Sequence, residues 1–359
     1  MKILIVKTSA IGDVTHTLPA LSALRRHYPR AQIDWLVEEA ASDLVTGHVA
    51  LNNVLISRRK SWLRDLKAGR LRCVVAEVGR FIGELRKTRY DWVIDFQNLL
   101  KSSIWVLLSR ADRKVGFGRG MEHSEGSYLF LNHRIPPVDM NIHALQRELL
   151  LLEKLGIPKG PVQYDLPIPP ESEQQAVTLL GEAGWVMDRE LVLINPVAKW
   201  PTKLWENDRF AAVADRLIAY GFQVAFTGSS EDRPTVDDIC NDMKREAVRL
   251  EGKTSLKILA AIIRRAGVLV TTDTGPMHIA AAAGTPVVAL FGATAPWRTG
   301  PYGDCHIVLR TNLSCSPCLK KTCRTTAYEQ RACLLRLTVD QVVDAVLGKM
   351  SAGNGCGRE

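Results

Sequence analysis

Long apolar runs are missing from this sequence. No stretch approaches the roughly 18 consecutive apolar residues that a membrane-spanning helix needs. The apolar start, Met1–Lys7, is too short for a signal peptide and lacks a cleavage site of small residues. We therefore expect a cytoplasmic protein whose first apolar run, Ile3–Val6, is a buried strand.

The signatures of several common enzyme classes are also absent. The chain contains no G-x-x-x-x-G-K-[ST] loop, no G-x-G-x-x-G, no G-x-S-x-G and no H-E-x-x-H. It contains no Asp-x-Asp pair, with which many transferases hold a metal-bound nucleotide. These absences argue against kinases, simple dehydrogenases, serine hydrolases and metal-dependent transferases.

Acidic residues are outnumbered by basic ones. The 47 Lys and Arg against 38 Asp and Glu give a formal charge of +9, which favours an anionic partner. Eleven of these cations lie between Arg58 and Arg89, interleaved with apolar residues. This pattern fits an amphipathic helix on an anionic membrane or an ordinary solvated helix face, and both alternatives stay open. A basic nucleic-acid-binding protein is a third alternative, but no known nucleic-acid motif supports it, and we expect no nucleic acid partner.

Short β-branched apolar runs alternate with segments of helical length. This alternation is typical of buried parallel sheets and predicts an α/β fold. The proline-rich segment Lys159–Pro170 separates two halves, which predicts domains at 1–160 and 161–347 and a disordered tail at 348–359. The expected strands are Ile3–Val6, Ile33–Val37, Trp92–Phe96, Leu191–Ile194, Val224–Thr227, Val268–Thr272 and Val287–Phe291.

Ligands of such sheets bind at the carboxyl ends of the strands, so the loops that follow strands are candidate sites. The first loop leads through Gly12 and Asp13 into a helix. Asp13 is either a helix cap or a general base, and the pattern alone favours the cap. The loop Asp273-Thr274-Gly275 precedes a helix of small residues that contains Met277 and His278. The amino end of that helix predicts a phosphate site, against the alternative of a plain turn.

Two further loops follow strands of the second half. One starts at Asn195 and carries Lys199 and Lys203, either of which could neutralise a diphosphate leaving group. The other contains Glu231, which either binds ribose hydroxyls or is simply solvated.

Four of the eight cysteines cluster in the sequence. Their spacing is Cys315-x2-Cys318-x4-Cys323-x9-Cys333. The C-x2-C pair is a common zinc half-site, so a structural zinc is one alternative. Unligated thiols are a second alternative, because the second pair is irregularly spaced, and an iron–sulfur cluster is a third that the pattern favours less.

Taken together, two segments resemble the lipopolysaccharide heptosyltransferases of glycosyltransferase family 9. KTSAIGDVTHTLPAL at Lys7–Leu21 resembles the opening of the type I enzymes, and DTGPMHIAAAAGTPVVALFG at Asp273–Gly292 resembles the donor-site segment. DFQNLLKSS at Asp95–Ser103 and VGFGRG at Val115–Gly120 match in the same order. The resemblance implies the GT-B fold, in which two Rossmann-like parallel-sheet domains face each other across a cleft.

The resemblance also implies a reaction. Heptose would pass from ADP-heptose, with inversion, to the Kdo residue of Kdo2-lipid A at the cytoplasmic face of the inner membrane, with peripheral attachment and no required cofactor. Asp13 would be the general base, and Lys199 or Lys203 would stabilise departing ADP; the family's lysine position is Ala198 here. Gly12 and Lys101 would contact the acceptor. The donor-binding residues would be Asn195, Glu231, Thr254, Asp273, Thr274, Gly275, Met277 and His278.

Two other enzymes fit the same resemblance less well. Heptosyltransferase II, which adds the second heptose, is the alternative within the family, although Lys7–Leu21 favours type I. A sugar-nucleotide epimerase of similar fold is a more distant alternative.

Overall fold

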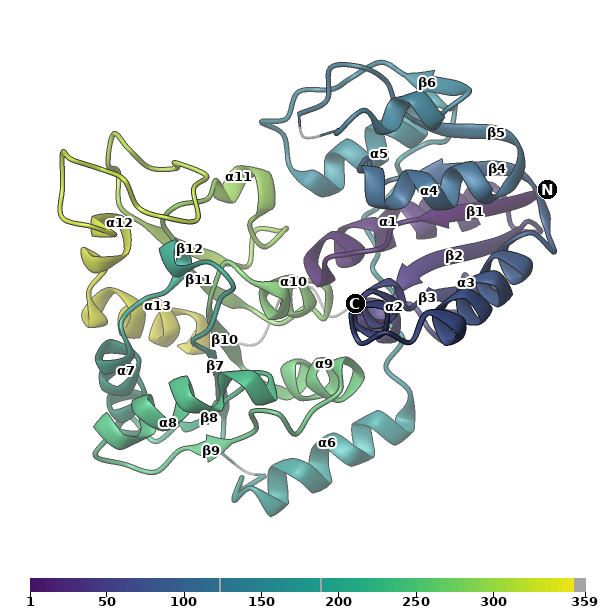
Figure 1. The fold of residues 1–359 in the computed structure, drawn as a ribbon. Helices are drawn as coiled ribbons and strands as arrows, with labels where there is room; N and C mark the ends of the chain where they lie inside the picture. Colours follow the sequence, from purple (N-terminus) through teal and green to yellow (C-terminus); the bar gives the residue numbers. More distant parts are fainter. Residues whose placement is uncertain (123, 188, 352–359) are drawn as a thin grey trace. The chain divides into compact units, whose positions relative to one another are not determined.

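The first apolar run forms β1 (Lys2–Val6), a central strand of a six-stranded parallel sheet (Figure 1). The computed structural model describes residues 1–122, 124–187 and 189–351, and it divides into two units, Met1–Pro167 and a second that begins at Ile168. The strand order in the first unit is β3-β2-β1-β4-β5-β6. The other strands are β2 (Gln32–Glu38), β3 (Asn53–Ser57), β4 (Arg89–Asp95), β5 (Arg110–Phe117) and β6 (His133–Ile135).

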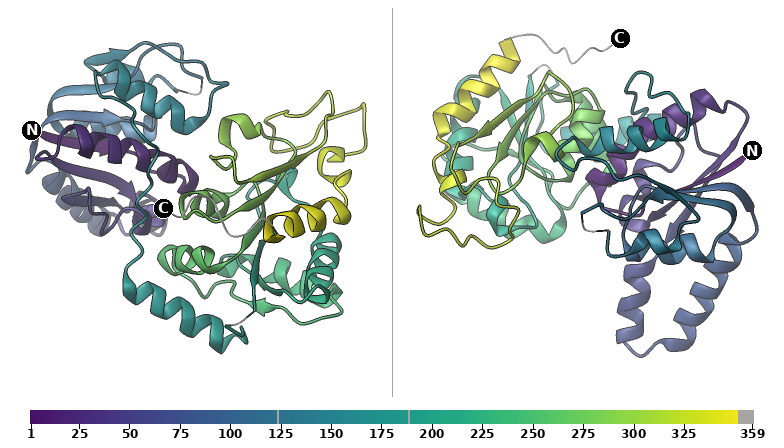
Figure 2. Two further views of the ribbon diagram at one scale, coloured as in Figure 1. Left: turned by 180° about the vertical axis from the view of Figure 1, so that it is seen from behind. Right: turned by 90° about the horizontal axis from the view of Figure 1, so that it is seen from above.

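Helices cover both faces of this first sheet (Figure 2). One face packs an aromatic cluster of Trp62, Phe81 and Trp105 from the α2, α3 and α4 helices. On the other face, α1 and α5 pack against each other. The helices are α1 (Ile11–His27), α2 (Arg59–Lys67), α3 (Leu71–Leu85), α4 (Leu100–Leu108) and α5 (Ala144–Lys154), with the 3₁₀ turns η1 (Glu39–Leu44) and η2 (Ser127–Phe130).

The second unit repeats this arrangement. Its parallel sheet has the order β12-β11-β10-β7-β8-β9. The strands are β7 (Leu191–Asn195), β8 (Gln223–Phe226), β9 (Val248–Arg249), β10 (Val268–Thr272), β11 (Val287–Phe291) and β12 (Ile307–Arg310). The helices are α6 (Pro170–Glu182), α7 (Asn207–Ala219), α8 (Arg233–Asp242), α9 (Leu256–Arg265), α10 (Gly275–Ala282), α11 (Pro296–Thr299), α12 (Ala332–Leu335) and α13 (Val339–Ser351), with the 3₁₀ turns η3 (Pro201–Lys203) and η4 (Ser230–Asp232).

Each sheet, counted from its own first strand, has the Rossmann order 3-2-1-4-5-6. The prediction of two Rossmann-like parallel-sheet domains is confirmed. In this order the direction of chain winding reverses between strands 1 and 4, and ligands bind at that point beyond the carboxyl ends of the strands. The reversal lies between β1 and β4 in one unit and between β7 and β10 in the other. The topology therefore predicts ligand sites in the loops after these four strands.

The seven expected strands are all present, whereas the strands β3, β5, β6, β9 and β12 are not foreseen from the sequence. β1 shows why the central strands are recognisable: Ile3, Leu4, Ile5 and Val6 are all fully buried. β5 begins Arg-Ala-Asp-Arg-Lys, and its exposed half has no apolar run to reveal it. Edge strands and half-exposed strands carry polar residues, and this weakens the signal.

The boundary between the units falls between Pro167 and Ile168, inside the predicted proline-rich segment and beyond the predicted limit at residue 160. Hydrogen bonds explain the difference. Arg26 on α1 donates to the Lys159 and Pro161 carbonyls and to Gln163, and Ser22 donates to Asp165. The segment 159–165 is thereby fastened to the first unit.

The predicted tail at 348–359 is wrong for its first four residues. Helix α13 continues through Ser351 because Val342, Val343 and Val346 bury its apolar face in the core of the second unit. The remainder of that prediction, 352–359, lies outside the described residues. Across the described ranges, no helix combines the length and apolar character needed to cross a membrane.

Candidate active site

Asp13 lies in the first turn of α1, directly after the loop that follows β1. Its Oδ2 accepts a hydrogen bond from the Ala10 backbone N–H at 2.9 Å, so Asp13 does cap the helix. The side chain is only half-buried, and Oδ1 makes no hydrogen bond with any described residue. The capping contact thus occupies one oxygen and leaves the other free to accept a proton. The two sequence interpretations, cap and base, are compatible. Gly12 precedes Asp13 in the same turn and is buried.

Gln97 fixes the loop that leads to Asp13. It follows β4, and its Oε1 accepts hydrogen bonds from the backbone N–H groups of Thr8 and Ser9, both at 3.0 Å. The Lys101 ammonium on α4 donates to Ser9 Oγ at 2.5 Å, which places this predicted acceptor residue beside the same loop. Burial lowers the pKa of Lys101, against the opposing charges of Glu38 and Asp13. Sequence reasoning missed Gln97, although it lies in the quoted segment Asp95–Ser103.

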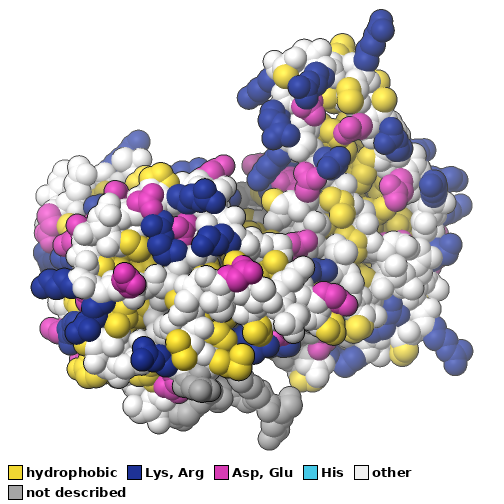
Figure 3. Space-filling view, turned by 90° about the horizontal axis from the view of Figure 1, so that it is seen from below, with side chains coloured by type: hydrophobic (Ala, Val, Ile, Leu, Met, Phe, Trp, Pro, Cys, Tyr) yellow, Lys and Arg dark blue, Asp and Glu magenta, His cyan; other side chains and the backbone are white. Residues whose placement is uncertain are grey.

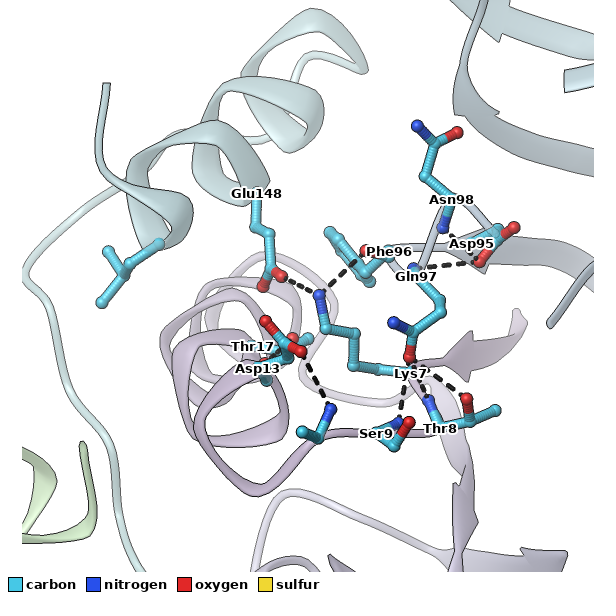
Figure 4. A network of polar contacts seen from close by, with 12 residues as sticks. Lys7, Thr8, Ser9, Asp13, Thr17, Asp95, Phe96, Gln97, Asn98 and Glu148 are labelled. Atoms are coloured by element: carbon cyan, nitrogen blue, oxygen red, sulfur yellow. Dashed lines mark hydrogen bonds and ion pairs between the residues drawn. The ribbon is translucent and has the colours of Figure 1, made fainter. Parts of the chain in front are cut away.

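A buried group of charges lies behind the loop (Figure 4). The Lys7 ammonium donates to Glu148 Oε1 at 2.6 Å and to the Phe96 carbonyl at 3.0 Å. Asp95 accepts from the Gln97 and Asn98 N–H groups, and burial raises the pKa of Asp95 to about 6 despite those bonds. Burial also raises the pKa of Glu148, and the charge of Lys7 reduces that shift. The sequence does not reveal Glu148 as part of this site, and Asp95 lies in the quoted segment Asp95–Ser103 without being singled out there.

In the second unit, Lys203 and Asp273 form an ion pair. The distance from Lys203 Nζ to Asp273 Oδ2 is 2.6 Å, and both side chains are largely buried. The short turn η3 turns Lys203 toward the end of β10, and its ammonium also lies over the Trp200 ring, 4.7 Å from the centroid. Lys199 is exposed and forms no ion pair with a described residue. Of the two predicted lysines, the structure brings Lys203 to the end of β10.

Asp273 and Thr274 precede the amino end of α10, which begins at Gly275. The first N–H groups of a helix have no partner within it, so this end can receive an anion. Thr274 is the N-cap residue, and its side chain makes no capping hydrogen bond. Met277 is fully buried and His278 nearly so. Asn195, at the end of β7, donates to Thr271 Oγ1 at 3.4 Å and to the Val197 carbonyl at 3.2 Å, which ties the β7 loop to β10.

Glu231 and Thr254 lie on loops that the structure joins. The Gly252 N–H donates to the Gly228 carbonyl at 2.9 Å, linking the loop after β8 to the loop after β9. Glu231 is exposed in η4 and Thr254 is half-buried just before α9. Both predicted nucleotide-contact residues therefore belong to one edge of the second sheet.

The four clustered cysteines line one cavity of about 290 Å³, together with Thr202, Gly292 and Arg331. Their thiols are free. The backbone N–H groups of Arg331 and Thr325 lower the pKa of Cys323. In the part of the chain that the structure describes, no group of three or more His, Cys, Asp or Glu residues is arranged to hold a metal ion. The zinc alternative therefore rests on spacing alone.

Comparisons with known proteins identify the family of this chain. The model of glycosyltransferase family 9 (heptosyltransferase) matches residues 78–329. The chain is 32% identical over 357 residues to lipopolysaccharide heptosyltransferase 1 of Pseudomonas aeruginosa, covering 95% of this chain and 92% of that protein. It is 28% identical over 312 residues to lipopolysaccharide heptosyltransferase 1 of Escherichia coli K12, covering 86% of this chain and 93% of the relative.

Solved structures of the family share the fold. Escherichia coli heptosyltransferase WaaC with ADP superimposes with a TM-score of 0.77 at 25% identity, over 97% of this chain and 100% of that one. Escherichia coli ADP-heptose LPS heptosyltransferase II gives the same TM-score at 22% identity, over 99% of this chain and 100% of the other. The predicted GT-B fold is confirmed, and the nucleic-acid-binding alternative is not favoured. The chain belongs to glycosyltransferase family 9, the heptosyltransferase family, and is a glycosyltransferase.

Proposed function

We propose that this chain transfers L-glycero-D-manno-heptose from ADP-heptose, with inversion, to the Kdo residue of Kdo2-lipid A. The choice of ADP-heptose as donor rests on the Lys203–Asp273 ion pair, since Asp273 directly precedes the amino end of α10. A cation and a helix amino terminus together suit a diphosphate. A relative of similar fold has been solved with ADP-2-deoxy-2-fluoro heptose, at 25% identity and a TM-score of 0.74, which supports this choice of donor.

The proposed chemistry is a single displacement. The acceptor hydroxyl oxygen bonds to the anomeric carbon of heptose while the bond from that carbon to the β-phosphate oxygen breaks. Asp13 takes the hydroxyl proton through its free oxygen, and ADP leaves with the electron pair of the broken bond. Lys203 and the N–H groups of α10 stabilise the developing charge on ADP. Asn195, Thr274, Gly275, Met277 and His278 shape the donor pocket, with Glu231 and Thr254 directed to ribose and adenine.

The acceptor assignment rests on the similarity to heptosyltransferase 1 proteins and on the loop from Ser9 to Asp13. Lys101 supplies a cation there for an acidic acceptor, and Gly12 allows a close approach to the backbone. Heptosyltransferase II remains the alternative, since it would use the same elements on an acceptor that already carries one heptose.

A donor and acceptor panel read by mass spectrometry tests this proposal. We expect heptose transfer from ADP-heptose to Kdo2-lipid A, with no transfer from UDP-glucose, and we expect the reaction to continue in EDTA. Preference for an acceptor that already bears one heptose would replace the type I assignment by type II. Loss of transfer in EDTA, restored by a divalent cation, would contradict the metal-independent mechanism.

We also propose that the enzyme associates peripherally with the cytoplasmic face of the inner membrane through the α2–α3 hairpin. This hairpin projects from the first sheet, and Lys, Arg and apolar side chains gather on it (Figure 3). Its large apolar residues on the surface are Leu63, Leu66, Leu71 and Val75. A surface that is both cationic and apolar fits anionic lipid headgroups over an acyl layer.

Two of the acidic side chains in this region, Asp65 and Glu77, have partners, whereas many of the cations do not. Asp65 pairs with Arg70, and Glu77 accepts a hydrogen bond from the Trp62 indole at 2.9 Å. Five cations on the hairpin form no ion pair with any described residue: Lys60, Arg64, Lys67, Arg72 and Arg80. The hairpin therefore presents an excess of positive charge, which an anionic bilayer would neutralise.

Vesicle co-sedimentation measures this association. We expect binding to vesicles of phosphatidylglycerol and phosphatidylethanolamine and little binding to phosphatidylcholine alone. The Arg64→Ala/Lys67→Ala variant should bind about 25-fold more weakly, since each cation near an anionic surface contributes roughly fivefold. Lys244→Ala/Arg245→Ala removes two exposed cations from the second unit and is the matched control. Equal losses in the two variants would show that the hairpin is not the contact surface.

A further inference from the structure

Lys7 is an unusual residue for the interior of a protein, because an ammonium group is costly to bury unless it is paired. Its residue exposure is 6%, and it follows β1 directly. Burial lowers the pKa of Lys7, but the negative charges of Glu148, Asp13 and Asp95 outweigh burial and leave that pKa raised. The ammonium therefore stays charged in the interior, held by carboxylates from separate elements.

Glu148 forms an ion pair with this ammonium from a second helix. It projects from α5, which packs along α1, the helix that carries Asp13. Figure 4 shows Glu148 and Asp13 approaching the Lys7 ammonium from these two helices. Thr17, one turn after Asp13, donates its hydroxyl to the Asp13 carbonyl at 3.0 Å, and its hydroxyl also lowers the pKa of Glu148. The pair thus lies against the turn of α1 that presents Asp13.

We propose that the buried Lys7–Glu148 pair positions Asp13 for catalysis: Glu148 holds the Lys7 ammonium behind the first turns of α1, and this ammonium orients the Asp13 carboxylate toward the acceptor hydroxyl. Both are positioning residues, since neither need touch the substrates. This inference rests on the proposed function of Asp13 as the general base.

The charges around Asp13 give the two residues opposite effects. Lys7 and Lys101 are cations whose charges interact with that of Asp13, and Glu148 is a neighbouring anion. Asp95 faces Lys7 from the end of β4. A nearby cation favours the ionised form of a carboxyl group and a nearby anion disfavours it. Removing Lys7 should therefore disfavour the charged form of the general base, and removing Glu148 should favour it.

The pH dependence of kcat at saturating ADP-heptose and Kdo2-lipid A tests this inference. Activity is lost at low pH as the base becomes protonated, so the acid limb of the profile reports its pKa in the bound complex. We expect Lys7→Met to move the acid limb up by about 1 pH unit and Glu148→Gln to move it down by about half a unit. The KM for ADP-heptose should stay within about twofold, since only steps that involve the base are changed.

Two controls separate positioning from general damage. Asp34→Asn removes another buried carboxylate of the same sheet, one that accepts a hydrogen bond from the Tyr90 hydroxyl at 2.8 Å, and it should leave the acid limb in place. The double variant Lys7→Met/Glu148→Gln removes both partners of the pair, and its acid limb should lie between those of the two single variants. Thermal unfolding verifies that each variant folds, and if one single variant does not, the other still has a predicted direction.

Acid limbs that stay fixed, or that move in the same direction in both single variants, would overturn the inference. An error in the proposed function would give a different result in the transfer assay. In that case the wild-type protein would transfer no heptose, or Asp13→Asn would keep wild-type turnover, whatever the state of Lys7 and Glu148.

Discussion

Asp13→Asn is expected to lower kcat for heptose transfer by about 10²–10⁴, the usual contribution of a positioned general base. The amide keeps an oxygen that can accept the Ala10 N–H bond, so the cap on α1 is preserved while the basic oxygen is lost. This separates the helix cap that the structure shows from the proposed role of the same side chain as general base. Steady-state kinetics with Kdo2-lipid A, together with calorimetric titration of ADP, are the measurements.

Asp13→Ala provides the comparison. It removes both the base and the cap, so it should lose the same factor in kcat and should also unfold more readily, by about 1 kcal/mol for a lost helix cap. ADP should bind to both variants as it does to the wild type, because the donor residues lie in the other unit. Near-wild-type turnover in Asp13→Asn would show that another group takes the proton.

Lys203→Met is the second substitution with a large expected effect. Removing one preorganised charge from a leaving-group site typically costs about 10²–10³ in kcat. Methionine keeps an unbranched side chain, one atom shorter, but leaves Asp273 without its cation, so ADP affinity should fall as well. The measurements are kcat with ADP-heptose and the Kd of ADP.

Lys199→Met is the natural comparison for Lys203→Met. Its ammonium is exposed and lies outside the pair with Asp273, so we expect a much smaller loss of kcat. Lys203→Arg retains a cation that can pair with Asp273 and should recover part of the activity. A larger loss in Lys199→Met than in Lys203→Met would reverse the assignment.

The choice between these two lysines shows where sequence reasoning stops. Both lie in one irregular loop, and spacing alone cannot say which of them turns toward β10. The turn η3, which begins at Pro201, decides the matter by directing Lys203 to Asp273, 70 residues away. Because this contact joins residues far apart in the sequence, no local sequence pattern shows which lysine makes it.

The central strands and the loops after them could be predicted because burial on both faces imposes apolar runs and because such sheets bind ligands at strand ends. The side chains that hold the loop after β1 in place could not be predicted from the sequence. Gln97 and Glu148 act on the residues Lys7–Ser9 from positions 88 to 141 residues away. Their residue types are ordinary on helices and loops, and only the packing of α5 on α1 and of β4 beside β1 gives them their roles.

The hydrogen bond from Ala10 to Asp13 has a thermodynamic consequence for the proposed reaction, in which Asp13 is the general base. A free aspartate side chain samples several rotamers and must lose that freedom when it accepts a proton in a defined direction. At position 13 the backbone has already selected one rotamer during folding. The loss of side-chain entropy is therefore part of the folding equilibrium and not of the activation barrier, which is one way in which a folded chain lowers the entropy of activation. A glutamate at this position, with one more rotatable bond, would retain the charge and forfeit this order.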